Sequence, residues 1–380
     1  MASFRKRTGG WEYRISVKEV DVKGKVKYRT VSKGGYRTKK EAEIAATRRY
    51  ETLAEDRGVK GQSIGQFVSE WYEENIEQKK DDYALNTRKT YSQVIKNHIV
   101  PKIGHVQVKE LTPKRYQRFI NELLEEFSAG TVRRIHTPIA LAFKQAVING
   151  YLISSPVQYV KIGKRERKKL KYLETKYVQE VLEFLYRRNY DQAIFFECLF
   201  ESGMRKGECT ALQLNDIDWT NNTIRVDETY NYQARGDEKR LDVVKTESSE
   251  RTIVMRPSFM QKLKTYVKYR IEKRSLVGSL YDTEHNFVFG RADGTPWPNS
   301  TIDNSFKAAL KSIEYDSLPI HSTRHTHAVM MLEAGATMKE VQERLGHSSM
   351  QVTADIYSHV TNKMKTRSIE LFDEYMKKNV

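Results

Sequence analysis

The spacing of apolar residues changes along the 380-residue chain, and this change constrains the fold more than any single motif. Apolar and polar side chains alternate over residues 11–36, as in half-buried strands. From residue 63 the apolar residues recur at intervals of three and four, as on one face of a helix, and from residue 174 helical and strand patterns are mixed. A chain of this length also exceeds one ordinary domain. We therefore expect a multidomain fold.

The first module, residues 1–58, is predicted to be a small β-sheet with one helix. Two short strands are expected at 11–20 and 25–32, and a third after the Gly-Gly turn that follows them. A helix should come next, because Thr38 is a suitable N-cap and Glu41, three residues later, completes a capping box.

The second module, residues 63–160, is predicted to be an all-α domain of four or five helices, with Ser, Asn or Thr at several helix starts and Gly or Pro at the breaks. Residues 161–173, KIGKRERKKLKYL, are almost wholly basic and are interpreted as a linker that can also follow a DNA backbone. The third module, residues 174–380, is expected to be a mixed α+β domain with a helix in its C-terminal tail.

The net charge of +17 narrows the class of partner. Such a surplus favours a polyanion through counterion release, and nucleic acid is the most common polyanion. An anionic membrane surface, or solubility alone, would also explain the charge; tyrosines among the basic residues favour nucleic acid. Candidate DNA-binding residues lie on the predicted strands, where a solvated sheet face is the alternative, and near helix starts or on polar helix faces. They are Arg14, Lys18, Lys27, Arg29, Arg88, Lys89, Lys96, Lys114, Arg115, Arg133 and Arg134.

Several functional classes are disfavoured. No apolar run approaches the roughly 20 residues that span a bilayer, and no apolar stretch follows the basic start to make a signal peptide, so a cytoplasmic protein without a membrane partner is expected. Cys198 and Cys209 are too few for a disulfide framework or a zinc site, and we expect reduced thiols in a core. The sequence contains no GxxxxGK[ST], HExxH, CxxC or GxSxG motif.

Four short stretches of the third module, rich in Arg, Lys and His, indicate another chemistry. Cutting and rejoining DNA without a high-energy cofactor requires a hydroxyl that attacks the phosphodiester and keeps the bond energy in a covalent link. Tyrosine suits this role, because a phenol pKa of about 10 makes it both a usable nucleophile and a good leaving group. The charge on the phosphate in the transition state calls for Arg forks, His donors and a general acid. The stretches supply Arg205, Lys245, His321, Arg324, His325, His347 and Tyr357.

These stretches, in this order, resemble the motifs of the tyrosine recombinases, the phage-type integrases. The family's TGxRxGE segment is matched by SGMRKGE at 202–208, and its hairpin Lys before TxxSxR by KTESSER at 245–251. Its HxLRHTHA segment is matched by HSTRHTHA at 321–328, and its LGHxS…T…YxH ending by LGHSSMQVTADIYSHV at 345–360. Each match alone is weak, but the four in the family's order are specific.

The resemblance implies a role for each matched residue, and it implies no metal or nucleotide cofactor. Thr323 departs from the family's usual Leu and is expected to alter packing beneath an arginine more than the chemistry. The implied roles are clamping of the scissile phosphate for Arg205 and Arg324, orientation of the first Arg and His pair for Glu208, assistance to proton transfer from the tyrosine for His321, donation to a phosphate oxygen for His347, general acid to the leaving 5′ oxygen for Lys245, and nucleophile for Tyr357.

The resemblance further implies a site-specific recombinase, an integrase that works through a 3′-phosphotyrosyl intermediate and a Holliday junction to integrate and excise a mobile element. Residues 1–58 would be an arm-type DNA-binding domain, residues 63–160 a core-binding (SAM-like) domain and residues 174–380 the catalytic domain. The partner would be double-stranded DNA at attachment sites. The tail after Tyr357 can pack on its own domain, but the resemblance favours docking on a neighbouring protomer in a homotetramer on DNA. A host DNA-bending protein and an excision factor are the further partners considered.

Three alternatives compete with this interpretation. A DNA-binding protein that kept the fold without the chemistry would have no reason to retain the full catalytic set. A type IB topoisomerase shares the chemistry, but its usual relatives lack an arm module. His321 and His325, one helical turn apart, resemble half a metal site, yet no third ligand has a suitable spacing; His325 and His327 are interpreted as structural.

Overall fold

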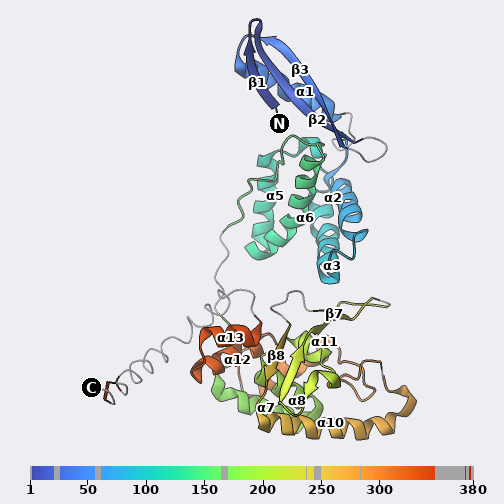
Figure 1. Ribbon diagram of the computed structural model, residues 1–380, viewed down its shortest axis with the longest axis vertical. Helices are drawn as coiled ribbons and strands as arrows, with labels where there is room; N and C mark the ends of the chain where they lie inside the picture. Colours follow the sequence, from blue (N-terminus) through green and yellow to red (C-terminus); the bar gives the residue numbers. More distant parts are fainter. Residues whose placement is uncertain are drawn as a thin grey trace. The chain divides into compact units, whose positions relative to one another are not determined.

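The computed structural model of the protein describes residues 2–20, 26–55, 61–163, 170–236, 238–243, 250–282 and 284–346, together with residues 373, 376 and 377. The chain forms two compact units, residues 1–167 and 168–380, which we call the N-terminal and C-terminal units. Figure 1 labels the elements of both. Within the described ranges, no helix combines the length and the apolar character needed to cross a membrane.

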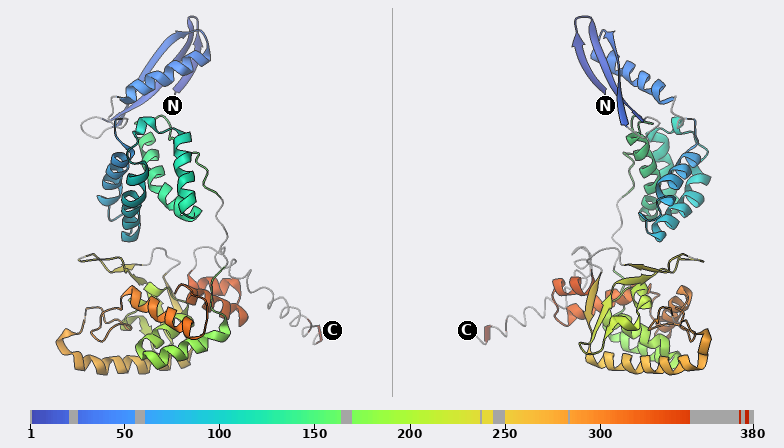
Figure 2. Two further views of the ribbon diagram at one scale, coloured as in Figure 1. Left: turned by 180° about the vertical axis from the view of Figure 1, so that it is seen from behind. Right: turned by 45° about the vertical axis from the view of Figure 1, so that its right-hand side comes forward.

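The N-terminal unit begins with a three-stranded antiparallel sheet in the order β1-β2-β3. Its strands are β1 (Ala2–Arg7), β2 (Gly10–Val20) and β3 (Val26–Tyr36), and helix α1 (Lys39–Glu55) lies along one face (Figure 2). Tyr13, Ile15 and Ala46 form the small core between sheet and helix. The predicted capping residues start the helix, since the Glu41 N–H donates to Thr38 Oγ1 at 3.1 Å, while the Glu41 carboxylate reaches one residue further back, to the N–H of Arg37 at 3.0 Å.

The strands differ from the prediction in two ways. β1 was not expected, because its sequence ASFRKR has no alternating pattern; its one large apolar residue, Phe4, packs against the core of the sheet. The second and third predicted strands are one strand, β3, because the sheet absorbs the Gly34–Gly35 pair as an irregularity in pairing between Trp11 and Tyr13. Gly35 takes a φ of +93°, which a residue with a side chain rarely adopts.

The rest of the N-terminal unit is helical, as predicted. Ser63, Thr112 and Ser128 cap three of the helices, each accepting a hydrogen bond from a main-chain N–H of the first turn. Two π-helical turns interrupt the regular spirals. In order, the elements are α2 (Ile64–Tyr72), η1 (Glu73–Glu77), α3 (Leu85–Val94), η2 (Ile95–Ile99), α4 (Val100–Ile103), η3 (Val108–Glu110), α5 (Pro113–Glu126) and α6 (Ala129–Ile148).

The C-terminal unit is a mixed α+β domain built around helix α8 (Tyr190–Ser202). The side chains of α8 from Gln192 to Phe200 are buried, and α7, α10 and α12 pack against it. Cys198 and Cys209 are free and buried, as expected. The other main helices are α7 (Val178–Arg188), α9 (Lys206–Ala211), α10 (Pro257–Val277), α11 (Asn299–Ser312), α12 (Ser322–Glu333) and α13 (Met338–Leu345).

Two small antiparallel sheets complete the C-terminal unit within the described residues. The first has the order β4-β5-β8, formed by β4 (Ile217–Asp218), β5 (Thr223–Val226) and β8 (Arg251–Val254). The second pairs β6 (Glu228–Tyr230) with β7 (Leu241–Val243). Helices α12 and α13 lie side by side and share a small core of Ala328, Val329, Leu332, Val341 and Leu345 (Figure 1).

Candidate active site

A tight turn between α8 and α9 sets the position of Arg205. Helix α8 ends at Ser202, and Gly203 takes the left-handed conformation with a φ of +67°. A Cβ atom at Gly203 would lie 2.6 Å from both His327 Cδ2 and Leu345 Cδ2, so only glycine fits this turn. Arg205 is the N-cap of α9, and its side chain keeps 40% of its surface exposed. The turn therefore presents a reachable guanidinium at the start of a helix.

Glu208 is the buried carboxylate that organises this turn, with only 3% of its surface exposed. It accepts from the main-chain N–H of Arg205 at 2.8 Å and from Arg205 Nη1 at 2.6 Å, and its Oε2 also accepts from Arg251 Nη2 at 2.9 Å. Burial alone raises the pKa of Glu208, but the Arg251 and Arg205 guanidiniums outweigh it and hold the pKa below its usual value. Glu208 is therefore an ionised bridge between two arginines.

Arg324 brings a third guanidinium to the same turn. It is 1% exposed; Nη1 donates to the Gly203 carbonyl at 2.9 Å and Nη2 to the Leu345 carbonyl at 2.5 Å. Its Nε has no hydrogen-bond partner among the described residues. Burial, followed by the charge of Arg205, lowers the pKa of Arg324 to about 9, which leaves it cationic at neutral pH. Thr323, the departure noted above, is buried and donates to the Ile320 carbonyl at 2.9 Å.

Two histidines stand at the start of α12. The rings of His321 and His325 meet edge to face, with centroids 4.8 Å apart. His321 keeps an exposed surface, whereas His325 is half-buried and its Nδ1 has no partner within the described ranges. Burial, followed by His325 and Arg324, lowers the pKa of His321, so this imidazole is neutral at pH 7 and can accept a proton.

His327 and Arg344 form a buried pair beside this group. His327 Nδ1 lies 2.7 Å from the Phe200 carbonyl, and its Nε2 accepts from Arg344 Nε at 3.0 Å. Burial, then the Arg344 charge, lower the pKa of His327 to about 3. A neutral ring fixed at both nitrogens supports the structural role predicted for His327.

The structure thus brings Arg205, Glu208, His321 and Arg324 into one cluster. The other three predicted catalytic residues, Lys245, His347 and Tyr357, lie outside the described residues. Arg251 also contacts this cluster and Arg344 contacts Arg251, and the sequence analysis gave neither a role. Both could have been noticed from the motifs, because Arg251 ends the KTESSER match and Arg344 directly precedes the Leu-Gly-His match.

Arg14 is the candidate DNA-binding residue of the sheet whose side chain the structure describes, and it is exposed. Tyr13 and Ile15 are buried beneath α1, so the alternating positions 12 and 14 fall on the opposite face. There Glu12 pairs with exposed arginines, through Arg5 Nε at 3.0 Å, Arg7 Nε at 2.6 Å and Arg14 Nε at 3.6 Å. The side chains of Lys18, Lys27 and Arg29 lie outside what the structure describes, so their contribution to a basic face stays a prediction.

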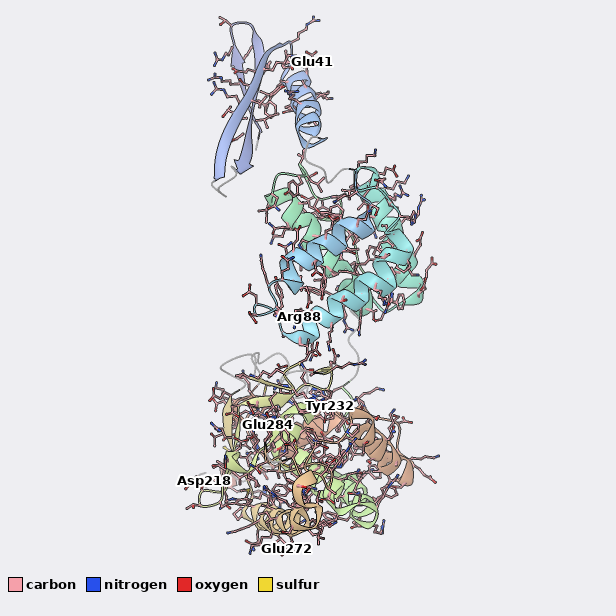
Figure 3. The ribbon with its side chains drawn as sticks, turned by 90° about the vertical axis from the view of Figure 1, so that its right-hand side faces the viewer. Glu41, Arg88, Asp218, Tyr232, Glu272 and Glu284 are labelled. Carbon is pink, nitrogen blue, oxygen red and sulfur yellow. The ribbon has the colours of Figure 1, made fainter. Side chains whose placement is uncertain are left out.

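The candidates in the helical module divide by environment. Arg88, labelled in Figure 3, donates to Glu77 Oε1 at 2.7 Å and keeps 16% of its side chain exposed. Arg133 donates to the Ala129, Ile162 and Gly163 carbonyls, and both arginines therefore hold the fold together. Lys89 is half-buried. The exposed candidates are Lys96, Lys114, Arg115 and Arg134.

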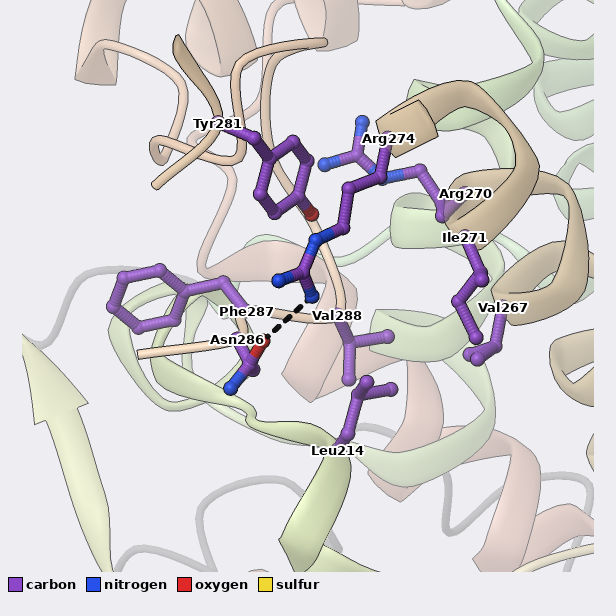
Figure 4. A pocket seen from close by; sticks show the side chains of 9 residues that line it. All are labelled: Leu214, Val267, Arg270, Ile271, Arg274, Tyr281, Asn286, Phe287 and Val288. Atoms are coloured by element: carbon purple, nitrogen blue, oxygen red, sulfur yellow. Dashed lines mark hydrogen bonds between the residues drawn. The ribbon is translucent and has the colours of Figure 1, made fainter. Parts of the chain in front are cut away.

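A small cavity beside α10 is separate in composition from the arginine cluster. Arg270 and Arg274 line it together with Tyr281, and Arg274 Nη1 donates to Asn286 Oδ1 at 3.3 Å (Figure 4). Arg270 also donates to the Gly290 carbonyl at 3.2 Å. None of the lining residues belongs to the cluster around Glu208, so the candidate active site lies outside this cavity.

Two family models match the chain. Residues 171–364 match the phage integrase family, and residues 67–124 match the phage integrase N-terminal SAM-like domain. The chain is 27% identical over 357 residues to a tyrosine recombinase XerC-like protein of Caldanaerobacter subterraneus subsp. tengcongensis, covering 89% of this chain and 90% of that one. It is 25% identical over 297 residues to the ICEBs1 integrase of Bacillus subtilis strain 168, covering 77% and 79%.

Solved structures share the fold at low sequence identity. The Tn1549 transposon integrase in complex with transposon right end DNA has a TM-score of 0.65 and 20% identity, covering 81% of this chain and 99% of that one. A lambda integrase dimer bound to a COC′ core site has a TM-score of 0.60 and 14% identity, covering 93% of both chains. These likenesses support the expected multidomain fold.

Proposed function

Because this chain belongs to the phage integrase family of tyrosine recombinases, we propose that Tyr357 attacks the scissile phosphate while the arginines around Glu208 stabilise the charge that develops there. The chain is a site-specific recombinase that cuts and rejoins DNA to integrate and excise a mobile element. The observation that carries the proposed division of roles is the buried Glu208, which fixes Arg205 and Arg251, with Arg324 bonded to the same turn.

The cleavage step needs a nucleophile, a phosphate clamp and a general acid. The Tyr357 oxygen forms a bond to phosphorus and the bond to the 5′ oxygen breaks, which leaves a 3′-phosphotyrosyl link. Lys245 gives its proton to the leaving 5′ oxygen. Arg205, exposed at a helix start, and Arg324, whose buried Nε has no hydrogen-bond partner among the described residues, are suited to the non-bridging oxygens.

Two histidines complete the proposed mechanism, one as a proton acceptor and one as a hydrogen-bond donor to the phosphate. His321 is a neutral imidazole with an exposed surface, as a group that takes the phenol proton must be. His347 donates to a phosphate oxygen. In the reverse step a 5′ hydroxyl from the partner duplex attacks the phosphotyrosyl bond, and repeated exchange passes through a Holliday junction. No step consumes a nucleotide, because the covalent link keeps the bond energy.

We assign the remaining modules to DNA binding and assembly. Residues 1–58 are the arm-type domain and residues 63–160 the core-binding domain, joined by the basic linker 161–173 to the catalytic domain, residues 174–380. Solved integrases of this fold are complexes with DNA, which supports attachment-site DNA as the partner here. The exposed residues Arg14, Lys96, Lys114, Arg115 and Arg134 are the better-supported contacts.

We also propose that four protomers assemble on two DNA sites, with the tail after Tyr357 docking on a neighbouring protomer. A host DNA-bending protein and an excision factor are the accessory partners that we assign to the integration and excision reactions. Sedimentation of the chain on paired attachment sites, with and without residues 362–380, tests the tail: loss of the four-protomer complex on truncation is expected, and an unchanged complex would contradict the docking.

A suicide substrate tests the chemistry. The core site carries a nick a few nucleotides to the 3′ side of the scissile phosphate. After cleavage, the short fragment that bears the free 5′ hydroxyl dissociates, so the reverse reaction cannot occur and the covalent protein–DNA link is trapped. Wild-type protein should become linked, whereas Tyr357→Phe should bind the same DNA without linking. Linking by the Phe variant would refute the assignment of the nucleophile, and no linking by wild type on its own attachment site would refute the proposed reaction.

A further inference from the structure

Arg344 connects the last turn of α13 to three other elements of the C-terminal unit. Its Nη1 donates to the Val254 carbonyl in β8 at 2.7 Å, its Nη2 to the Glu201 carbonyl in α8 at 3.1 Å, and its Nε to His327 Nε2 in α12 at 3.0 Å. Three directed bonds from one planar guanidinium fix its position far more closely than a single ion pair would.

The acceptors of Arg344 are neutral groups. Two are main-chain carbonyls, and the third is the ring of His327, whose other nitrogen is engaged with the Phe200 carbonyl. Among the residues that the structure describes, no carboxylate forms a salt bridge with Arg344. Burial lowers the pKa of Arg344. The hydrogen bonds of Arg344 to neutral groups thus fix its position, while the charge of Glu201 opposes the effect of burial on its pKa.

The backbone of the same turn receives two arginines of the candidate active site. Arg251 Nε donates to the Arg344 carbonyl at 2.8 Å, and Arg324 Nη2 donates to the Leu345 carbonyl at 2.5 Å. The last carbonyls of a helix lack partners within the helix and attract cations, so the end of α13 is a natural acceptor for both. The helix closes at Gly346, with a φ of +66°, directly before His347 in the sequence.

We propose that Arg344 is a positioning residue for DNA cleavage. It holds the last turn of α13 against α8, α12 and β8, so that the helix ends at Gly346 at a fixed point beside Arg251 and Arg324. This inference rests on the proposed function, in which His347 and Tyr357, which follow Gly346 in the sequence, act. Arg344 touches no reacting atom itself. Lysine cannot replace it, because one ammonium does not reproduce the three directions of the guanidinium.

The test compares Arg344→Lys with a matched control, Arg256→Lys, in the full-length protein. Arg256 donates to the carboxylate of Glu201, whose carbonyl Arg344 also uses, but no bond from Arg256 to α13 is present among the described residues. Three quantities are measured: affinity for an un-nicked core-site duplex, the single-turnover rate of covalent linkage to the suicide substrate, and hydrogen–deuterium exchange of the amides of α13.

For Arg344→Lys we expect unchanged DNA affinity, faster exchange in α13 and linkage slower by about tenfold or more, since small displacements of reacting groups cost that much in rate. The control should match wild type in all three. Wild-type linkage by Arg344→Lys would overturn the inference. A parallel loss of affinity and linkage, with faster exchange throughout the C-terminal unit, would also overturn it, because it would show a merely structural role.

A second variant covers the case in which Arg344→Lys does not fold. His327→Gln replaces the ring that receives Arg344 Nε and leaves both carbonyl bonds in place. We expect slower linkage at unchanged DNA affinity, and linkage at the wild-type rate would overturn the inference. Failure of the wild-type protein to link at all would refute the proposed function instead, so the two failures are distinguishable.

Discussion

Arg251 Nη2 lies 2.9 Å from Glu208 Oε2, and both side chains are almost fully buried. This pair joins the first residue of β8 to α9, and the second oxygen of Glu208 holds Arg205. Breaking a buried ion pair by neutralising one partner leaves an uncompensated charge, which is costly. Neutralising Glu208 should therefore disturb the arginine cluster strongly.

Glu208→Gln should slow covalent linkage by about tenfold or more, because the amide keeps the size of the side chain but turns a donor toward one of the two arginines. DNA affinity should be retained, since the DNA-binding modules are unchanged. Single-turnover linkage and duplex binding measure the two effects. Glu201→Gln is the control: its carboxylate binds Arg256, which is mostly exposed, and a small effect is expected. Equal effects of the two variants would argue against a special role for Glu208.

The free energy of unfolding should decrease as the pH falls below about 6.5, in part because of His327. Its folded pKa of about 3 lies below the ordinary histidine value of about 6.5, so in the folded state it does not take up a proton that the unfolded chain binds. Its contribution is present in full above about pH 6.5 and is lost as the pH falls toward 3.

Urea unfolding at pH 7, 6 and 5 tests this. The free energy of unfolding should fall more steeply for wild type than for His327→Gln, by up to about 1.4 kcal/mol per pH unit below 6.5. Parallel curves for the two proteins would mean that His327 is not held neutral.

Gly203→Ala should destabilise the C-terminal unit more than Gly236→Ala. Both glycines have positive φ values, +67° and +57°, so both substitutions carry a backbone penalty of about 1–2 kcal/mol. Only at Gly203 would the new Cβ also meet His327 and Leu345, whereas nothing described lies within 4 Å at Gly236. Thermal unfolding midpoints measure the difference, and equal midpoints would contradict the packing at the turn.

Arg14→Ala should weaken binding to arm-site DNA and lower the slope of log affinity against log salt by about 1, as expected for one lost phosphate contact. Lys33→Ala removes the same charge from a position that is in phase with the buried Tyr13, and it should have less effect. Titrations at several salt concentrations separate the two variants. A larger effect of Lys33→Ala would place the DNA on the other face of the sheet.

Much of the fold could be predicted from the sequence, because period and capping are local properties. Thr38 and Glu41 start α1 as expected, and the helical module follows its apolar spacing. β1 could not be predicted, because its pairing with β2 depends on a partner strand and not on its own pattern. Gly34–Gly35 looked like a turn, since the sequence does not show that a neighbouring strand absorbs an irregularity there.

The candidate site divides in the same way. The motif order pointed to Arg205, Glu208, His321 and Arg324, and the structure gathers them. The motifs mark the positions of Arg251 and Arg344, but the groups that these arginines contact could not be predicted, because the contacts join residues that lie 43, or 90 or more, positions apart in the chain. The sequence predicts a phosphate contact for Arg88, because it does not show that Arg88 pairs with Glu77, 11 residues earlier. That ion pair depends on how two helices pack.

The most direct test of the proposed chemistry is to identify the amino acid that carries the DNA. Wild-type protein is trapped on the suicide substrate, the complex is digested with protease and nuclease, and the peptide that retains a nucleotide is sequenced by mass spectrometry. The nucleotide should be found on Tyr357, in a peptide from residues 345–360. A nucleotide on any other residue, with Tyr357 unmodified, would contradict the assignment of the nucleophile.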